Sequence, residues 1–525
     1  MIPRVIAALI AVGAAFAALL GGIGAGSESV SAGTLPAPNI VVITTDDQRL
    51  TLNGRIMPET KKRVVDKGTR FTQAIVTTPL CCPSRASLIT GQYAHNHGAL
   101  STRAGYGSLG DKENVLPEWL RQVGYRTTHI GKYLNGYPGT GQIPPEVVGP
   151  GWDEWATLLT PRLYYDYDLS IDGVPTHFGI RDQDQLTRVL NRKAVQAIKR
   201  NAPADAPFFI QLDHFAPHTE PQKSRAGRCG GNVVPDPRDL GKFSDEPLNR
   251  PSSYNEADVA DKPSFVQAFK PLSPKRRDAV KQRNRCRLEA LQGVDRGTAQ
   301  IVKALKEVGE LDQTVIVFLS DNGYFLGEHR LKANKTLPYE EALRVPLAIR
   351  APRAYRGGGE RIKKSQAPVA NIDLVPTLLD WAGADPCRAP GDCRTMDGRS
   401  LVELLSGDAA SVPDDRALLV EYGREVEGDN IFGVCGYEGL RLLPLTYIEY
   451  TSVQTEAGVC VPSGERELYD VSVDPQQLSN LFPPAPGTPD ALRTAELEAR
   501  LSGLQDCAGI EGRDPDPPGR QTYCE

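Results

Sequence analysis

The sequence predicts an α/β fold built on a large, mostly parallel sheet. Three runs rich in apolar residues, at 40–45, 207–212 and 314–320, are typical of strands buried on both faces of such a sheet. Amphipathic patterns at residues 187–200 and 273–309 lie between these runs and predict helices. Strands that alternate with helices indicate the α/β class. The chain has 525 residues, 40% of them hydrophobic, which is enough for one large domain and a smaller one.

The remaining elements follow from shorter patterns. In chain order we expect a helix at 57–68, a strand at 71–76, a helix at 116–123, strands at 125–130 and 345–350, and a helix at 371–380. Residues 219–270 are polar and rich in proline, which predicts a long excursion that forms a lid or one wall of a cleft. From about residue 408 the pattern changes to shorter strands and turns, at 417–421, 439–443 and 446–451.

The net charge and the N-terminal residues limit the possible partners and the cellular location of the protein. The net charge of -5 and the pI near 5.9 argue against nucleic acid as a main partner, although they allow an anionic small substrate. Residues 1–33 predict a signal peptide, because Arg4 precedes an apolar run at 5–20 and small residues follow at 21–27. An uncleaved N-terminal membrane anchor is the alternative. Either interpretation predicts a secreted or extracytoplasmic protein.

The cysteines are consistent with export. Eight of the ten cysteines form pairs that are close in the sequence. Eight cysteines allow 105 pairings, and proximity alone suggests these four disulfides. The expected pairs are Cys229 with Cys286, Cys387 with Cys393, Cys435 with Cys460, and Cys507 with Cys524. Four disulfides would suit an oxidising compartment.

Oxygen-bearing side chains follow two of the predicted buried strands. Asp46 and Asp47 come directly after the strand at 40–45, and Asp321 and Asn322 come directly after the strand at 314–320. Ligands bind at the carboxyl ends of strands in open α/β sheets. Adjacent buried carboxylates are costly unless a cation is present, and these four side chains predict a site for a hard divalent cation, Ca²⁺ or Mg²⁺.

The run Cys81-Cys82-Pro83-Ser84-Arg85 is typical of the start of a helix. Pro83 suits a first helical position, where its missing N–H would be unpaired in any case. Arg85 is four residues from Cys81, so it would lie on the same helix face. The free N–H groups and the positive dipole end of the helix make this start an anion site.

The stretch from Cys81 to Gly91 resembles the signature of the type I sulfatases, C-x-P-S-R followed by L-x-T-G. The resemblance implies that a maturation enzyme oxidises Cys81 to Cα-formylglycine, whose hydrated aldehyde is the nucleophile. It also implies an alkaline-phosphatase-like sandwich, in which helices flank a large, mostly parallel central sheet and a smaller C-terminal antiparallel sheet carries a helix near 489–504. The implied domains are a catalytic domain at 34–407 and a C-terminal subdomain at 408–525.

The same resemblance implies roles for the other site residues. The catalytic set is Cys81, Arg85, Lys132 and His218, with Arg85 fixing the hydrated aldehyde and His218 the general acid. The substrate-binding set is Lys132, Lys335, His218, Asn135 and His329, of which His329 is chosen because it lies close to Lys335 in the sequence. The metal set is Asp46, Asp47, Cys81, Asp321 and Asn322, and the metal of the family is most often Ca²⁺.

One branch of the family matches best. The run Lys132-Tyr133-Leu134-Asn135 and the stretch at 150–179 resemble the N-acetylglucosamine-6-sulfatases. Many other sulfatases carry a His where this chain has Leu134, so we expect Asn135 to take over that polar role. The expected substrates are sulfated sugars, such as N-acetylglucosamine 6-sulfate units of glycosaminoglycans, and aryl sulfates. Aromatic residues at 152–167 would suit either a sugar ring or packing.

Two alternatives stay open at this point. A phosphonate or phosphate ester hydrolase could use the same site, because some relatives do so. A catalytically silent relative could bind sulfated carbohydrate with an unmodified Cys81. Contact with a membrane is expected only through an uncleaved N-terminal segment.

Overall fold

The computed structural model describes residues 36–525 except 104, 138–143, 203, 222–228, 230–232, 424–431, 518 and 520. Residues 37–525 form one compact unit. The expected signal segment at 1–33 lies outside the described residues. The division at residue 407 stays a prediction.

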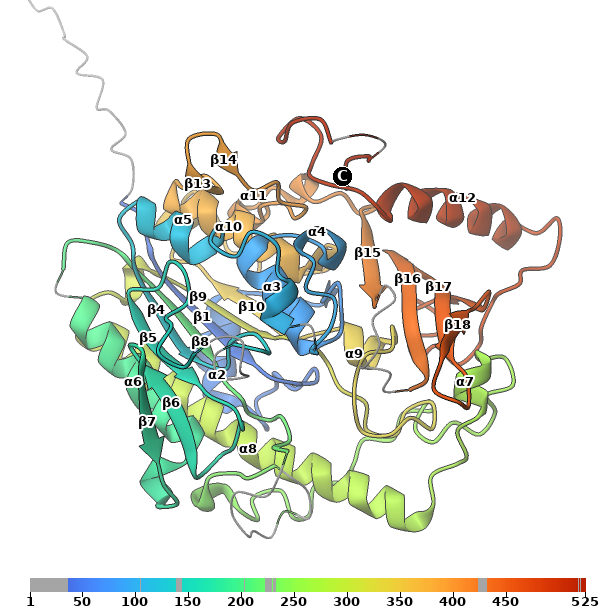
Figure 1. Ribbon diagram of the computed structural model, residues 1–525, viewed down its shortest axis with the longest axis horizontal. Helices are drawn as coiled ribbons and strands as arrows, with labels where there is room; N and C mark the ends of the chain where they lie inside the picture. Colours follow the sequence, from blue (N-terminus) through green and yellow to red (C-terminus); the bar gives the residue numbers. More distant parts are fainter. Residues whose placement is uncertain are drawn as a thin grey trace, which may run out of the picture. The chain divides into compact units, whose positions relative to one another are not determined.

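A ten-stranded sheet runs through the centre of this unit (Figure 1). Its five central strands are parallel, and the outer strands on both sides add antiparallel pairs. The strands in order across the sheet are β11 (Lys364–Ser365), β2 (Thr69–Phe71), β10 (Leu347–Arg350), β9 (Thr314–Ser320), β1 (Asn39–Thr45), β8 (Phe208–Asp213), β4 (Arg126–Gly131), β5 (Glu154–Leu158), β6 (Tyr167–Ile171) and β7 (Val174–Phe178). The predicted mostly parallel sheet is therefore confirmed.

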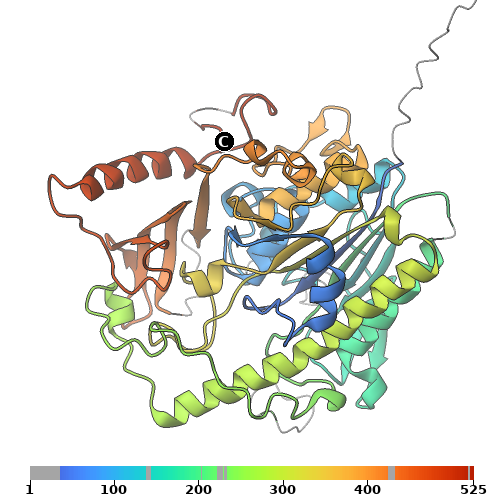
Figure 2. The ribbon, with the colours of Figure 1, turned by 180° about the vertical axis from the view of Figure 1, so that it is seen from behind.

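Helices cover both faces of this sheet. Along β1, Ile40 and Val42 pack into one core cluster, and Val41 and Ile43 pack into another, because successive side chains point to opposite faces. The first cluster contains side chains of α3 (Cys81–Thr90), α5 (Leu116–Gln122), α10 (Leu374–Ala382) and α11 (Val402–Ser406). The second lies beneath α6 (Leu186–Asn201) and α8 (Pro274–Glu307), with α2 (Pro58–Arg63) against α8 (Figure 2). Both faces of the sheet are therefore sealed, as its uninterrupted apolar strands require.

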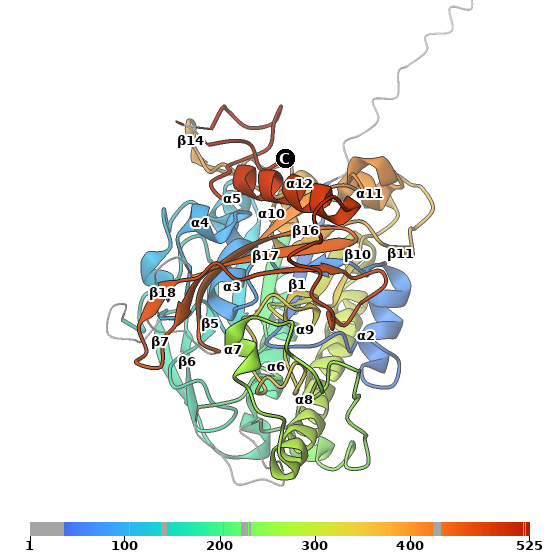
Figure 3. The same ribbon diagram turned by 90° about the vertical axis from the view of Figure 1, so that its right-hand side faces the viewer.

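A second, antiparallel sheet follows in the C-terminal part of the chain (Figure 3). It contains β15 (Ala417–Tyr422), β16 (Val434–Leu442), β17 (Leu445–Gln454), β18 (Cys460–Pro462) and β19 (Arg466–Asp470). Helix α12 (Pro489–Leu504) packs on β15 and β16, as expected from the sequence. The short elements are α4 (Ala94–His97), α7 (Ser264–Gln267), α9 (Glu340–Leu343), β3 (Ala74–Ile75) with β12 (Val369–Ala370), and β13 (Cys387–Ala389) with β14 (Asp392–Cys393).

One predicted strand is wrong in its continuity. The expected strand at 71–76 is two short strands, because β2 pairs with β10 and β11, whereas β3 pairs with β12 in a separate sheet. All four predicted disulfides are confirmed. Among the residues that the structure describes, none of the helices combines the length and apolar character that a membrane crossing needs.

Candidate active site

The two strand ends with oxygen-bearing side chains lie next to each other. Strands β1 and β9 are paired in parallel with Thr45 opposite Ser320, so the residues after them meet at one edge of the sheet. The backbone N–H of Asp47 donates to Asp321 Oδ1 at 3.0 Å, and Asn322 Nδ2 donates to Asp47 Oδ1 at 2.7 Å. These side chains and Asp46 are buried, so the predicted cluster of oxygens does form.

Helix α3 presents Cys81 to this cluster. The helix begins at Cys81 after the extended residue Leu80, and it ends at Gly91, whose φ of 70° few other residues adopt readily. The sequence suggested that Pro83 is the first helical residue. Because the helix begins at Cys81, Pro83 is instead the third. Its missing N–H still falls in the first turn, where N–H groups have no partner within the helix. The Cys81 side chain is buried, with 3% of the residue exposed.

Three cations surround the acidic cluster. Lys132 Nζ lies 2.5 Å from Asp46 Oδ2, and Lys335 Nζ donates to Asp47 and lies 2.9 Å from Cys81 Sγ. Arg85 Nε donates to Asp321 Oδ2 at 2.8 Å, on the same side of α3 as Cys81. The cations therefore hold the acidic cluster together from three sides.

The charges of these groups are set by burial and by one another. Burial opposes ionisation of Asp46, but the nearby cations, Lys132 first among them, hold the pKa of that carboxyl far below its usual range. Burial, together with the Asp46 carboxylate, raises the pKa of Asp321 to about 6. Burial also raises the pKa of the Cys81 thiol, so the unmodified side chain is a neutral thiol at pH 7.

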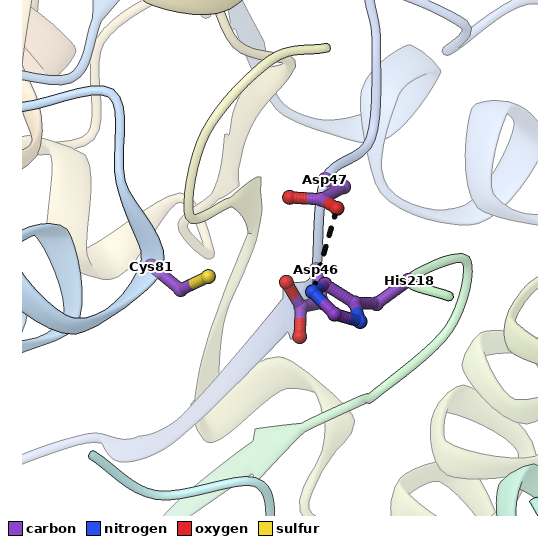
Figure 4. Close-up of side chains that lie close together, drawn as sticks. All are labelled: Asp46, Asp47, Cys81 and His218. Atoms are coloured by element: carbon purple, nitrogen blue, oxygen red, sulfur yellow. Dashed lines mark ion pairs between the residues drawn. The ribbon is translucent and has the colours of Figure 1, made fainter. Parts of the chain in front are cut away.

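His218 closes the cluster from the loop after β8. Its Nδ1 lies 2.5 Å from the carbonyl oxygen of Thr219, which can only accept, so Nδ1 carries a hydrogen and Nε2 faces Asp47 Oδ2 at 3.7 Å (Figure 4). Burial lowers the pKa of His218 to about 4, against the opposing charges of Asp46 and Asp47. The imidazole is therefore neutral at pH 7 in this state.

The residues present fit a hard divalent cation. Ligand atoms of Asp46, Asp47, Cys81 and His218 all lie within 4.8 Å of one another (Figure 4). Asp46 Oδ1 and Asn322 Oδ1 are buried and have no hydrogen-bond partner among the residues that the structure describes, which costs free energy unless a cation satisfies them. Asp321 is not in that group of four, and its two oxygens accept hydrogen bonds from Asp47 and Arg85.

A pocket of about 580 Å³ opens above this cluster. Of the predicted site residues it is lined by Cys81, Lys132, Asn135, His218 and Lys335. Its volume lies within the range of sites for small molecules. The structure therefore brings most of the predicted substrate-binding residues together around one cavity.

His329 is the exception, and a direct contact with substrate is not supported. It has no exposed surface and is not among the residues that line the pocket. Its Nδ1 lies 2.7 Å from Glu256, and its ring stacks on Tyr339 at 4.2 Å. Glu256 lies 73 residues away in the sequence, so the proximity of His329 to Lys335 could not reveal this contact.

The aromatic residues at 152–167 pack and do not face the pocket. Trp152, Trp155 and Tyr164 are among the buried core residues. Trp155 and Trp152 enclose His129, whose ring centroid lies 4.7 Å and 5.4 Å from theirs. Of the two interpretations left open for these residues, packing is the one that the structure supports.

Sequence reasoning missed three residues of the site. Asp213 ends β8 and lies 3.6 Å from Arg85, and its place after an apolar run was a signal like that of Asp46. Arg287 of α8 donates to the carbonyls of Asp47 and Pro217, so it joins the two loops of the cluster. Arg162 lines the pocket, and its sequence context carries no signal for that position.

Comparison with known proteins places these observations in a family. A family model described as Sulfatase matches residues 38–384, more than half of the chain. An arylsulfatase of Volvox carteri is 32% identical, covering 91% of this chain and 76% of that protein. The human N-acetylglucosamine-6-sulfatase is 31% identical, covering 93% and 88%. An extracellular sulfatase homolog of Drosophila melanogaster is 32% identical over 75% of this chain, but the match covers only 34% of that protein.

Solved structures agree on the fold. A structure in complex with its substrate, D-glucosamine-2-N,6-O-disulfate, has a TM-score of 0.71 at 23% identity and covers 89% of this chain and 97% of its own. A phosphonate monoester hydrolase of Agrobacterium radiobacter has a TM-score of 0.64 at 21% identity, with 89% and 95% covered. The fold and the matched relatives together make this chain a member of the sulfatase family, the sulfuric ester hydrolases.

Proposed function

We propose that the protein is an exported sulfatase that hydrolyses sulfate esters of sugars with a formylglycine made from Cys81 and a divalent cation. The observation that carries the proposal is the position of Cys81, whose Sγ lies 2.9 Å from Lys335 Nζ beside the strand-end carboxylates. A nucleophile, a cation site and two lysines therefore share one pocket. Four disulfides and the signal-like residues 1–33 support export.

Each charged residue of the site has a role in the proposed reaction. When present, the cation, held by Asp46, Asp47, Asp321 and Asn322, would polarise the sulfate, and the aldehyde hydrate at residue 81 would supply the attacking hydroxyl. Lys132 and Lys335 bind the sulfate oxygens and offset the charge that grows on them in the transition state. Arg85 orients the side chain at position 81, since both lie on one face of α3.

His218 is the proposed proton donor to the leaving oxygen. It lines the pocket, and the carbonyl of Thr219 fixes the orientation of its ring through Nδ1. The opposite nitrogen, Nε2, is thereby directed at the reacting groups. It must take up a proton before it can donate one, and the negative charge of a bound sulfate ester would favour this by raising the pKa of His218. A sugar alkoxide is a poor leaving group, so a proton delivered there contributes far more than it would for a nitrophenolate.

The proposed substrates are sulfated amino sugars, such as the N-acetylglucosamine 6-sulfate units of glycosaminoglycans. Support comes from the run Lys132–Asn135, from the human relative named for that activity, and from the structural neighbour bound to a disulfated glucosamine. The matched arylsulfatase supports turnover of simple aryl sulfates as well. A phosphonate monoester hydrolase with the same fold supports the second candidate, hydrolysis of phosphonate or phosphate esters.

Two measurements test the proposal. Mass spectrometry of the peptide that contains residue 81 should find the aldehyde in active enzyme, and a thiol in fully active enzyme would contradict the mechanism. Turnover of 4-nitrophenyl sulfate should exceed that of 4-nitrophenyl phosphate and phenylphosphonate. A preference for either phosphorus ester would favour the second candidate, and release of no sulfate from any ester would favour a silent carbohydrate-binding protein.

A further inference from the structure

Among the described residues, Arg162 is a cation of the active-site pocket that has no carboxylate partner. Lys132 and Lys335, which also line the pocket, are paired with Asp46 and Asp47. Arg162 lines the same pocket, and in the described part of the chain it is paired with no acidic side chain. A guanidinium without a counter-ion in a pocket that binds anions is a candidate for recognition of a further anion.

The hydrogen bonds of Arg162 are also incomplete. Its Nη2 donates to the carbonyl oxygen of Leu134 at 3.1 Å, and its Nε is buried without a partner in the part of the chain that the structure describes. Burial lowers the pKa of Arg162, although Asp46 and Cys81 act in the opposite direction. Burial of this incompletely paired guanidinium therefore costs free energy, and an anionic ligand in the pocket would reduce that cost.

Asn135, next to Leu134, also has an incomplete set of hydrogen bonds, but here the atom concerned is an acceptor. Its Oδ1 is buried and accepts no hydrogen bond from any described residue, and the side chain lines the same pocket. Arg162 and Asn135 thus line one pocket, and each has a buried polar atom, a donor and an acceptor respectively, that lacks a partner among the described residues. A sugar substituent that carries both an anionic group and an N–H or O–H would satisfy both.

Arg162 is not ion-paired with the carboxylates beside the reacting sulfate, as far as the described residues show. Arg85 and Lys132 lie within 4.0 Å of Asp46, whereas the structure records no ion pair between Arg162 and Asp46 among the residues that it describes. The reacting group lies beside Cys81, between Lys132 and Lys335. The pocket of about 580 Å³ leaves room for a sugar ring that reaches from there to Arg162.

We propose that Arg162 and Asn135 form a subsite for a second anionic group of the substrate, so that the enzyme prefers sugars that carry another anion besides the ester it cleaves. The inference rests on the proposed sulfatase function. The second anion is an N-sulfate on the same ring or the carboxylate of a neighbouring uronate. A sulfate group and a carboxylate each offer two oxygens that a guanidinium can bind through two hydrogen bonds.

Steady-state kinetics of sulfate release test this subsite. The substrates are N-acetylglucosamine 6-sulfate, glucosamine 2-N,6-O-disulfate and a disaccharide of a uronate with N-acetylglucosamine 6-sulfate. For the preferred dianionic substrate, Arg162→Gln should raise KM about tenfold to a hundredfold, the value of a charge-assisted hydrogen bond. The KM for the monoanionic sugar should rise less than threefold, and Arg162→Lys should recover part of the loss because it keeps the charge.

Arg126→Gln is the matched control, because it removes the same charge from an exposed position at the start of β4. It should leave all three KM values unchanged. The dianionic sugar that responds to Arg162→Gln identifies the source of the second anion. An equal loss on all three substrates would assign Arg162 to the reacting sulfate and overturn the proposal, as would no loss on either dianionic sugar.

Inhibition of the wild-type enzyme tests the subsite without any variant. Glucosamine N-sulfate or the unsulfated disaccharide should inhibit turnover of 4-nitrophenyl sulfate at least tenfold more tightly than N-acetylglucosamine. If neither inhibits more tightly, the subsite does not exist. Turnover of 4-nitrophenyl sulfate itself reports on the proposed function, so failure of the subsite and failure of the function give different results.

Discussion

Adjacent residues at the start of α3 have opposite surroundings. Cys81 lines the pocket beside Lys335, whereas Cys82 has no exposed surface and packs in the core with Ala86. Successive helical residues are rotated by about 100° around the axis, which explains how one thiol faces the chemistry and the next faces the core. Burial raises the pKa of Cys82 to about 12, so it is an inert thiol.

Replacement of each cysteine should therefore have different effects. Cys81→Ala should abolish turnover, because it removes the side chain proposed to become the nucleophile. Cys82→Ala should retain at least half of the activity and lower the unfolding temperature by a few degrees, because it only leaves a small cavity. The measurements are 4-nitrophenyl sulfate turnover and thermal unfolding, and activity of Cys81→Ala like that of the wild type would refute the assignment.

Substitution of His218 separates proton donation from binding. His218→Gln should lower kcat about 10²- to 10⁴-fold for N-acetylglucosamine 6-sulfate, whose leaving group needs a proton. The loss should be less than tenfold for 4-nitrophenyl sulfate, because nitrophenolate leaves without one. His177→Gln, at an exposed position on β7, is the control. Equal losses on both substrates would mean that His218 holds the cation or the sulfate.

Removal of the cation tests the oxygen cluster. Dialysis against a chelator should abolish turnover, and added Ca²⁺ or Mg²⁺ should restore it, with the more effective ion identifying the cofactor. The unfolding temperature should also fall on chelation, because Asp46, Asp47 and Asp321 are buried together and lose the charge that offsets their repulsion. Full activity after chelation would exclude a metal role for this cluster.

At the scale of elements, the C-terminal sheet supports the segment that carries Lys335. Tyr437 of β16 donates to the carbonyl of Thr336 at 2.6 Å, and Tyr339 donates to Glu467 of β19 at 2.8 Å. Thr336 has a φ of 99°, which a β-branched residue rarely adopts without such support. The small sheet therefore helps to position a lysine of the pocket.

Loss of this support should reduce catalysis without any contact with substrate. Tyr437→Phe should lower kcat/KM about threefold to thirtyfold, since it removes one buried hydrogen bond next to Lys335. Tyr447→Phe is the matched control, because that buried tyrosine donates to Glu449 in the same sheet, away from the segment at 335–339. If both variants behave alike, the sheet contributes only stability.

The elements also show what sequence patterns can predict. The helices at 273–309 and 489–504 and the strands at 40–45 and 314–320 were predictable because their periodicity is local and their apolar runs are long. The break in the strand predicted at 71–76 was not, because it depends on which distant strands pair with each half.

The same contrast holds for the site. The positions of Asp46 and Asp47 were predictable because they directly follow an apolar strand, and that of Cys81 because it begins a short motif. The position of His329 away from the pocket lining and that of Arg162 within it were not, since they depend on contacts with Glu256 and Leu134 that the local sequence does not reveal.

At the scale of the whole molecule, ion pairs join the C-terminal part to the catalytic part. His95 of α4 lies 3.0 Å from Glu421 of β15 and 2.9 Å from the carbonyl of Cys507. Burial opposes the charge on His95, but the Glu421 carboxylate and the Cys507 carbonyl outweigh it and raise the pKa of His95 to about 9. The imidazolium therefore persists in the folded protein at neutral pH.

This pair predicts a pH dependence of stability. A His whose pKa is raised on folding stabilises the protein fully below pH 6.5, and this contribution disappears as the pH rises through about 9. Each pKa unit corresponds to about 1.4 kcal/mol. The unfolding temperature of the wild type should therefore fall between pH 6.5 and 9 more steeply than that of His95→Gln. Parallel curves for the two proteins would show that the pair contributes nothing.

The pairing of β1 with β9 also imposes an order of events on biosynthesis. Asn39 lies opposite Thr314, so the centre of the sheet stays open until more than three hundred residues have emerged from the ribosome. Once the sheet closes, only 3% of Cys81 is exposed. If Cys81 is converted as proposed, the oxidising enzyme would meet this thiol on the nascent, still unfolded chain, and a protein that folds too quickly would be trapped as an inactive thiol form.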